Sequence, residues 1–206
     1  ASKSERAACI DFNDTALRWI LSQDKIKTVV ISSPFRHILS ASLTTRDDHR
    51  FDSVEERKAA LVRSATELGR ALAIAGKKLV IVSPPPATGM DLGLCPIRMH
   101  LNGVAGAACD FPIGKHWSGS ALAIELVKSL ESVAPVVWLD DYLCTNGTCR
   151  VTLDGTPRYR DADHLSNAGS AELGRRVDLA GAIRAAAATR PPEEGPAARC
   201  ERRGKS

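Results

Sequence analysis

Residues 160–169 read Arg-Asp-Ala-Asp-His-Leu-Ser-Asn-Ala-Gly, and a helix-like apolar pattern follows them. Asp161 precedes His164 by three residues, and either Ser166 or Asn167 can cap the following helix. On a turn, this spacing lets a carboxylate hold one imidazole nitrogen while the other nitrogen takes a proton from a nucleophile. The stretch therefore predicts that His164 is a catalytic base and that Asp161 orients it. The alternative is a solvated turn that only caps a helix.

Upstream of this stretch, helix-like and strand-like segments alternate. Four segments carry apolar residues at helical spacing. The first follows Asn13 or Asp14, the second Ser53, the third Ser118 or Ser120, and the fourth Asn167. A capping box is formed by Ser53 and Glu56. Predicted strands cover residues 26–32, 79–82 and 136–139. The alternation predicts an α/β fold: a three-layer, doubly wound (flavodoxin-like), mostly parallel sheet with helices on both faces.

Length and composition favour one domain. The 206 residues suffice for one well-buried α/β core and are too few for two. We expect a linker-like segment at 1–8, the domain at 9–188 and a disordered tail at 189–206, with disorder beyond Pro191 and Pro192. The last helix is expected from Asn167 to about Ala187, with Leu173, Val177, Ala180 and Ile183 facing inward.

Charge and hydropathy exclude two classes of protein. The net charge is +4, and the basic excess lies partly in the C-terminal tail, so no nucleic-acid-binding face is predicted. No segment approaches the roughly 20 apolar residues of a membrane span. No signal peptide opens the sequence either, so any targeting signal is expected upstream.

Six cysteines point to an oxidising compartment. Cys144 and Cys149 flank an Asn-Gly pair that favours a tight turn, which predicts a disulfide between them. A staple between Cys95 and Cys109 would stabilise the Gly-rich part of a long loop that runs from Pro84 to Trp117. Cys9 and Cys200 can pair with each other or with other partners. A zinc site is the alternative, but the cysteine spacing is looser than in zinc motifs, and we expect no metal.

The pattern Tyr159-Arg160-Asp161-x-x-His164-Leu165-Ser166-x-x-Gly169 resembles the last motif block of the SGNH hydrolase superfamily. More narrowly, it resembles the SGNH domain fused behind membrane-bound acyltransferases of family 3. The resemblance covers most of the chain from Cys9 onward. It includes residues 29–35 (where the family often continues into Arg-Trp), the segment from Pro84 to Cys95, and the Leu143-Cys144-x-x-x-x-Cys149 element.

This resemblance implies a Ser–His–Asp set in an extracytoplasmic domain tethered to the inner membrane. It implies an acyl donor relayed by the membrane acyltransferase domain, a surface-polysaccharide acceptor, and no cofactor. The alternatives are a carbohydrate acetylesterase and an inactive glycan-binding module. The family's Gly-Asp-Ser block is absent, and no Asn follows the 26–32 strand. We therefore expect the first strand and its serine to lie upstream, and an exposed apolar edge beside residues 26–32.

The remaining candidates have ordinary structural interpretations. Ser32 and Ser33 end a predicted strand and are expected to be turn residues rather than the nucleophile. Asp140 and Asp141 follow the strand at 136–139, where they can either support the site or cap the next segment. Four further histidines have no ligand-spaced partners and are expected on the surface or in loops: His37, His49, His100 and His116.

Overall fold

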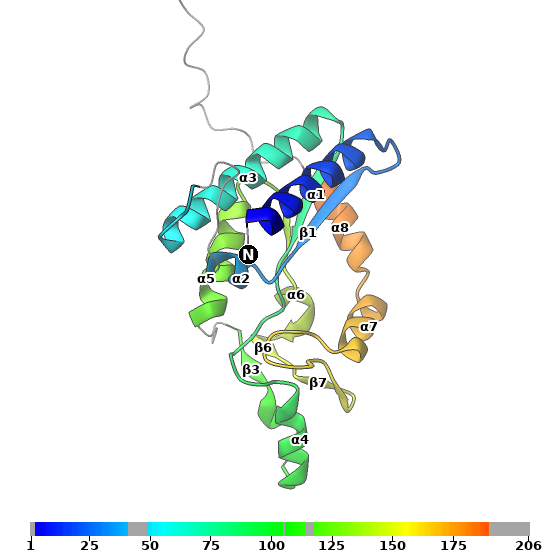
Figure 1. Cartoon of the computed structure of the whole chain (residues 1–206). Helices are drawn as coiled ribbons and strands as arrows, with labels where there is room; N and C mark the ends of the chain where they lie inside the picture. Colours follow the sequence, from blue (N-terminus) through cyan, green and yellow to red (C-terminus); the bar gives the residue numbers. More distant parts are fainter. Residues whose placement is uncertain (1–2, 41–48, 105, 114–117, 190–206) are drawn as a thin grey trace, which may run out of the picture.

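The computed structural model describes residues 3–40, 49–104, 106–113 and 118–189 (Figure 1). Within them, a parallel sheet contains β1 (Thr28–Ser32), β2 (Lys78–Val82) and β4 (Val136–Val137), in the order β1-β2-β4. β1 and β2 pair in register from Thr28↔Lys78 to Ser32↔Val82, and Ile81 and Val82 of β2 pair with β4. The predicted parallel sheet is confirmed, although its third strand is shorter than the predicted 136–139.

Helices cover both faces of the sheet, as predicted. Alternate strand residues, such as Ile31 and Ile81, face a core built with α2 (Arg36–Ser40), α3 (Val54–Ile74) and α5 (Ser118–Leu130). The opposite face, with Val80 and Val82, packs against α7 (Asn167–Arg176) and α8 (Leu179–Ala188). This division follows from the period-2 alternation of side chains along a strand.

β1 forms one edge of this sheet in the described residues. Its residue Val30 points to the face that α7 and α8 cover elsewhere, yet it remains 42% exposed. An apolar residue is thus exposed on the edge strand, as expected from the sequence. None of the described helices is both long and apolar enough to cross a bilayer.

The start of α3 shows why its boundary was predictable. The Ser53 hydroxyl accepts a hydrogen bond from the Glu56 backbone N–H (3.1 Å), and the Glu56 carboxylate accepts one from the Ser53 backbone N–H (3.2 Å). Backbone N–H groups of Ser53 and Asp52 lower the pKa of Glu56. Gly76, just beyond the helix, has a φ of 68°, which favours glycine.

The N-terminal helix starts earlier than predicted. α1 spans Lys3–Ser22, so the expected cap at Asn13 or Asp14 is wrong, and residues 3–8 are helical rather than linker-like. These residues lack an apolar stripe, which is why the periodic pattern became visible only further along. Their helix propensity and the acidic Glu5 in the first turn nonetheless favour a helix.

The C-terminal helix is divided in two. Val177 adopts extended backbone angles, and Asp178 caps α8 by accepting a hydrogen bond from Gly181 N–H (2.7 Å). The break changes the helical phase, so Ala180 is exposed rather than inward-facing, whereas Leu173 is buried. The single helix predicted from Asn167 to Ala187 is therefore wrong. Residues 190–206, which include most of the expected tail and Cys200, lie outside the described part of the chain.

The long loop after β2 has its own structure. It contains α4 (Leu94–Leu101), a 3₁₀ turn η1 (Gly106–Cys109) and β3 (Phe111–Pro112). The disulfide Cys95–Cys109 joins α4 to η1, which confirms the expected staple. Cys9 is exposed and forms no disulfide with any cysteine in the described part of the chain.

A small antiparallel sheet pairs β3 of this loop with a later hairpin. After the short helix α6 (Asp140–Leu143), β5 (Cys144–Thr145) turns through Asn146 and Gly147, both at positive φ, into β6 (Thr148–Cys149), which pairs with β3. The predicted disulfide Cys144–Cys149 is confirmed. The predicted hairpin is formed by β7 (Thr152–Leu153) and β8 (Thr156–Pro157), and it delivers the chain to Asp161.

Candidate active site

A closed loop at residues 158–166 presents the predicted pair. Backbone bonds join Arg160 N–H to His164 O (2.9 Å) and Ser166 N–H to Arg158 O (2.8 Å). The Ser166 hydroxyl caps α7 by accepting from Gly169 N–H (2.8 Å) and donates to Pro157 O (2.7 Å). The loop therefore has little freedom at either end.

Asp161 and His164 form the hydrogen-bonded pair that the sequence predicted. Imidazole Nδ1 lies 2.9 Å from Asp161 Oδ1 and 3.0 Å from Oδ2. The same Oδ1 accepts the backbone N–H groups of Asp163 (3.1 Å) and His164 (2.8 Å), which fixes the carboxylate. Because a carboxylate only accepts, the neutral imidazole carries its proton on Nδ1 and leaves Nε2 with a free lone pair.

The electrostatics keep Asp161 ionised. Partial burial raises the pKa of Asp161, but hydrogen bonds from the Asp163 and His164 backbones outweigh burial. The His164 ring and the Arg160 guanidinium, 3.3 Å from Asp161, add to them. The net pKa of Asp161 lies well below its usual range, so the orienting group remains a carboxylate at any physiological pH.

This lowered pKa predicts a pH dependence of stability. The folded-state pKa of Asp161 lies below the unfolded value of about 4, so its contribution is fully present above about pH 4 and is lost as the pH falls through the folded-state pKa. The difference in free energy of unfolding between wild type and Asp161→Asn should therefore shrink from pH 6 towards pH 2, as measured by urea denaturation. Asp24→Asn, in an exposed turn, is the control. A difference that stays constant with pH would contradict the assignment.

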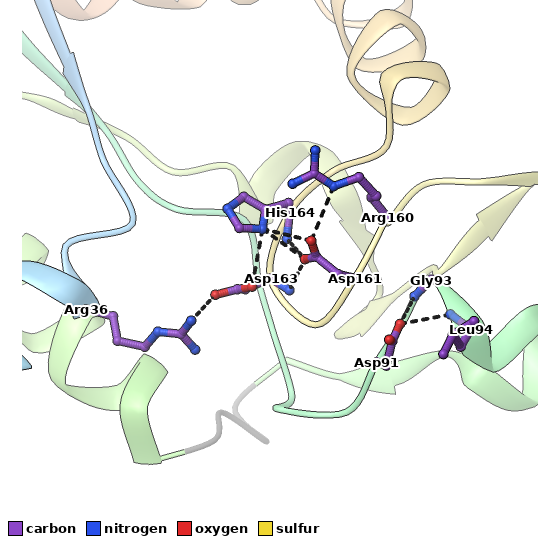
Figure 2. A network of polar contacts seen from close by, with 8 residues as sticks. All are labelled: Arg36, Asp91, Gly93, Leu94, Arg160, Asp161, Asp163 and His164. Atoms are coloured by element: carbon purple, nitrogen blue, oxygen red, sulfur yellow. Dashed lines mark hydrogen bonds and ion pairs between the residues drawn. The ribbon is translucent and has the colours of Figure 1, made fainter.

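A second carboxylate ties the loop to the first strand. Asp163 forms an ion pair with Arg36, which begins α2 just after β1, and lies 3.4 Å from Nδ1 of His164 (Figure 2). Figure 2 shows one ring nitrogen of His164 facing both carboxylates, with Arg36 reaching Asp163 from the side away from Asp161. Arg36 thus offsets the charge of Asp163 and holds the loop against the end of β1.

A cavity of ≈ 360 Å³ opens beside His164. It lies at the carboxyl ends of β1 and β2, where open α/β sheets bind ligands. Its walls come from both strand ends, α5, the site loop and α7: Ser32, Ser33, Pro34, Arg36, Pro84, Pro85, Ala87, Ala123, Ile124, Arg160, Asp163, His164, Leu165 and Ser170. Ser32 and Ser33 therefore line the cavity, whereas Asp140 and Asp141 begin α6 and do not.

Two glycines allow the neighbouring elements to approach the loop closely. A Cβ atom at Gly93, just before α4, would lie 2.1 Å from the Arg160 carbonyl oxygen. A Cβ at Gly169 in α7 would lie 2.2 Å from the Arg158 carbonyl oxygen. Because both neighbours are backbone atoms, neither can move away easily. The loop is thus held between α4 and α7.

A buried ion pair holds the start of the loop. Arg158 is 7% exposed and donates to Glu172 through Nε (3.0 Å) and Nη2 (3.3 Å). Its Nη1 donates to Leu143 O (3.0 Å). The next residue, Tyr159, is buried edge-on against Phe111, and burial raises the pKa of its hydroxyl. These contacts fix the chain immediately before Asp161.

Two other histidines lie away from the site. His49 lies edge-on to Phe51 and His100 is exposed in α4, and neither of the two lines the cavity. His37 belongs to α2. His116 lies outside the described residues. Asp161, Asp163 and His164 bring three ligand atoms within 4.8 Å of one another, a geometry that suits a metal ion. Arg36 already offsets the charge of Asp163, and Arg160 offsets that of Asp161. We therefore interpret the two carboxylates as partners of the His164 imidazole rather than as metal ligands.

The sequence analysis did not predict that Arg36, Arg160 and Asp163 contribute to the site. Arg36 and Asp163 are 127 residues apart, and no local pattern joins them. A signal for Arg36 was its position four residues after the end of the predicted strand 26–32, since site residues gather beyond strand ends in α/β folds.

Comparisons with known proteins agree with the fold and show the family of the chain. The family model described as the SGNH domain fused to AT3 domains matches residues 1–178. The structure also resembles the periplasmic domain of a lipopolysaccharide acetyltransferase from Salmonella ser. Paratyphi A, with a TM-score of 0.55 at 12% sequence identity. The match covers 84% of this chain and 63% of that one, and at this identity it shows the fold alone. No curated protein matches the sequence. The family match spans most of the chain, and the chain belongs to the family of SGNH domains that are fused to AT3 domains.

Proposed function

We propose that this domain takes part in O-acylation of a cell-surface polysaccharide, with His164 as the catalytic base and Asp161 as its partner. The observation that supports this most directly is the Asp161 carboxylate on Nδ1, because it leaves Nε2 able to accept a proton beside the cavity. Family membership supports acyl transfer as the type of reaction.

In the proposed reaction, Nε2 accepts the hydroxyl proton of a serine as its oxygen attacks the acyl carbonyl carbon. The tetrahedral intermediate collapses to an acyl-serine, and the imidazolium returns its proton to the leaving group. A sugar hydroxyl then attacks the acyl-serine, and Nε2 takes and returns the proton in the same way. Asp161 stabilises the imidazolium at each stage. The chain contains no Gly-Asp-Ser block, and we propose that the serine is supplied from outside residues 1–206.

We also propose an extracytoplasmic location, tethered through a membrane acyltransferase domain that relays the acyl donor. Two disulfides support an oxidising compartment. The similar Salmonella structure is a periplasmic domain, which supports the same location. The fusion of this family to AT3 domains supports the tether.

Gene deletion followed by measurement of ester-linked acyl groups on the surface polysaccharide tests the proposal. An acyltransferase predicts that deletion lowers the O-acyl content, quantified by proton NMR before and after mild alkali, and that the whole gene restores it. An esterase predicts the opposite, a rise on deletion. A glycan-binding module predicts a loss on deletion that a gene encoding His164→Gln still restores. Either of the last two results would overturn the proposal.

A further inference from the structure

Helix α4 projects from the body of the domain, at the end that carries the site (Figure 1). Its residues Cys95 and Met99, four apart, face inward and pack on the small core of Leu92, Phe111 and Tyr159. Residues three and four apart share a helix face. The other face of α4 carries Leu94, Ile97 and Leu101 at this spacing.

That outer face is apolar and exposed. Ile97 is 52% and Leu101 78% exposed, and Leu94 is also on the surface. Met90, four residues before the start of the helix, is also exposed. Arg98 and His100 are exposed on the helix and lie next to the apolar stripe on its two sides. We name Leu94, Ile97 and Leu101 the α4 stripe.

The α4 stripe is held rigidly relative to the site. The Cys95–Cys109 disulfide joins the helix to η1, and Asp91 caps it by accepting from the N–H groups of Gly93 (3.0 Å) and Leu94 (2.9 Å) (Figure 2). Gly93 packs directly against the Arg160 carbonyl. Eight helical residues span about 12 Å, so the stripe begins beside the His164 loop and extends about that far from it.

We propose that the α4 stripe is a membrane-contact element, which inserts into the headgroup region of a bilayer that contains anionic lipid. An aliphatic face with a cationic side chain at its edge, here that of Arg98, is the pattern of a helix that lies at a bilayer interface. A specific protein–protein contact buries roughly 800 Å² on each partner, far more than three partly exposed side chains provide. Weak insertion is sufficient for a domain that a tether already keeps near the bilayer.

The purpose of this contact rests on the proposed function. If an acyl group is passed from a membrane domain, a stripe fixed beside the His164 loop would keep the cavity turned towards the membrane. Insertion would also restrict rotation of the domain about its tether. The contact itself can be measured without any acyl transfer, so the two proposals can fail separately.

The test is co-sedimentation of the disulfide-bonded 206-residue chain with vesicles of equal parts phosphatidylcholine and phosphatidylglycerol. The double variant Ile97→Glu/Leu101→Glu should bind at least about tenfold more weakly than wild type, because two inserted aliphatic groups become charged. Ile74→Glu is the matched control, since Ile74 is 89% exposed at the far end of α3 and should leave binding unchanged. Thermal unfolding checks that the double variant remains folded. His164→Ala should bind as wild type does.

Three results would overturn the proposal. Wild-type protein that ignores the vesicles excludes lipid as the partner. Equal binding by wild type and the double variant excludes the α4 stripe, and equal weakening by Ile74→Glu means that the effect is not specific to it. If wild type ignores vesicles while the double variant lowers O-acyl content in cells, the stripe docks on a protein instead.

Discussion

Replacing His164 by alanine in the whole protein is expected to reduce acyl transfer by about 10⁶-fold, which is effectively complete loss. The variant removes the nitrogen that accepts the serine proton. Asp161→Asn should cost less, about 10⁴-fold, because the imidazole remains while its orienting carboxylate is lost. The measurement is the rate at which O-acyl groups appear on the polysaccharide, with protein abundance checked by immunoblot.

His49→Ala is the matched control, since His49 lies against Phe51 and outside the cavity. It should retain wild-type transfer. The side chain of His164 is about half exposed, so the alanine variant should fold normally and keep its thermal midpoint. Full activity of a folded His164→Ala variant would remove the base from the proposed reaction.

The second large effect concerns stability. Glu172→Ala is expected to lower the free energy of unfolding by about 3–5 kcal/mol, because it leaves the guanidinium of Arg158 buried without a counter-charge. Urea denaturation of the 206-residue chain measures this. The double variant Arg158→Met/Glu172→Leu should recover much of the loss, because it removes both charges and keeps the volume apolar.

Arg176→Ala is the control for this prediction. Arg176 also contacts Glu172 (3.3 Å), but its side chain is 55% exposed, so the expected cost is below about 1 kcal/mol. A loss of less than 1 kcal/mol for Glu172→Ala would show that solvent reaches Arg158 once its partner is removed. The double variant would then bring no recovery.

The elements predicted correctly from the sequence are those with strong local signals. The Ser53–Glu56 capping box, the Asn146-Gly147 turn and the spacing of Asp161 and His164 each depend on residues within five positions. Local hydrogen bonds decide such features, and the surrounding fold changes them little.

The sequence predictions failed where contacts between distant parts of the chain determine the local structure. α4 contains a proline as its third residue and follows a Pro- and Gly-rich segment, yet the disulfide and the Asp91 cap stabilise it. The division of the last helix had a local signal in Asp178, a good capping residue, but continuous apolar spacing concealed it. The Arg158–Glu172 pair joins a hairpin to a helix, so no periodic pattern in the sequence predicts it.

The Arg36–Asp163 ion pair has a consequence for how the domain is made. Its two residues are 127 positions apart in the chain, so neither strand β1 nor the His164 loop can complete the cavity alone. During synthesis from the N-terminus, Arg36 emerges long before Asp163, and contacts of such long sequence separation form late in folding. The base therefore reaches its place only after nearly the whole domain has been synthesised. A nascent chain consequently has no assembled cavity until the segment that carries Asp163 and His164 has been added.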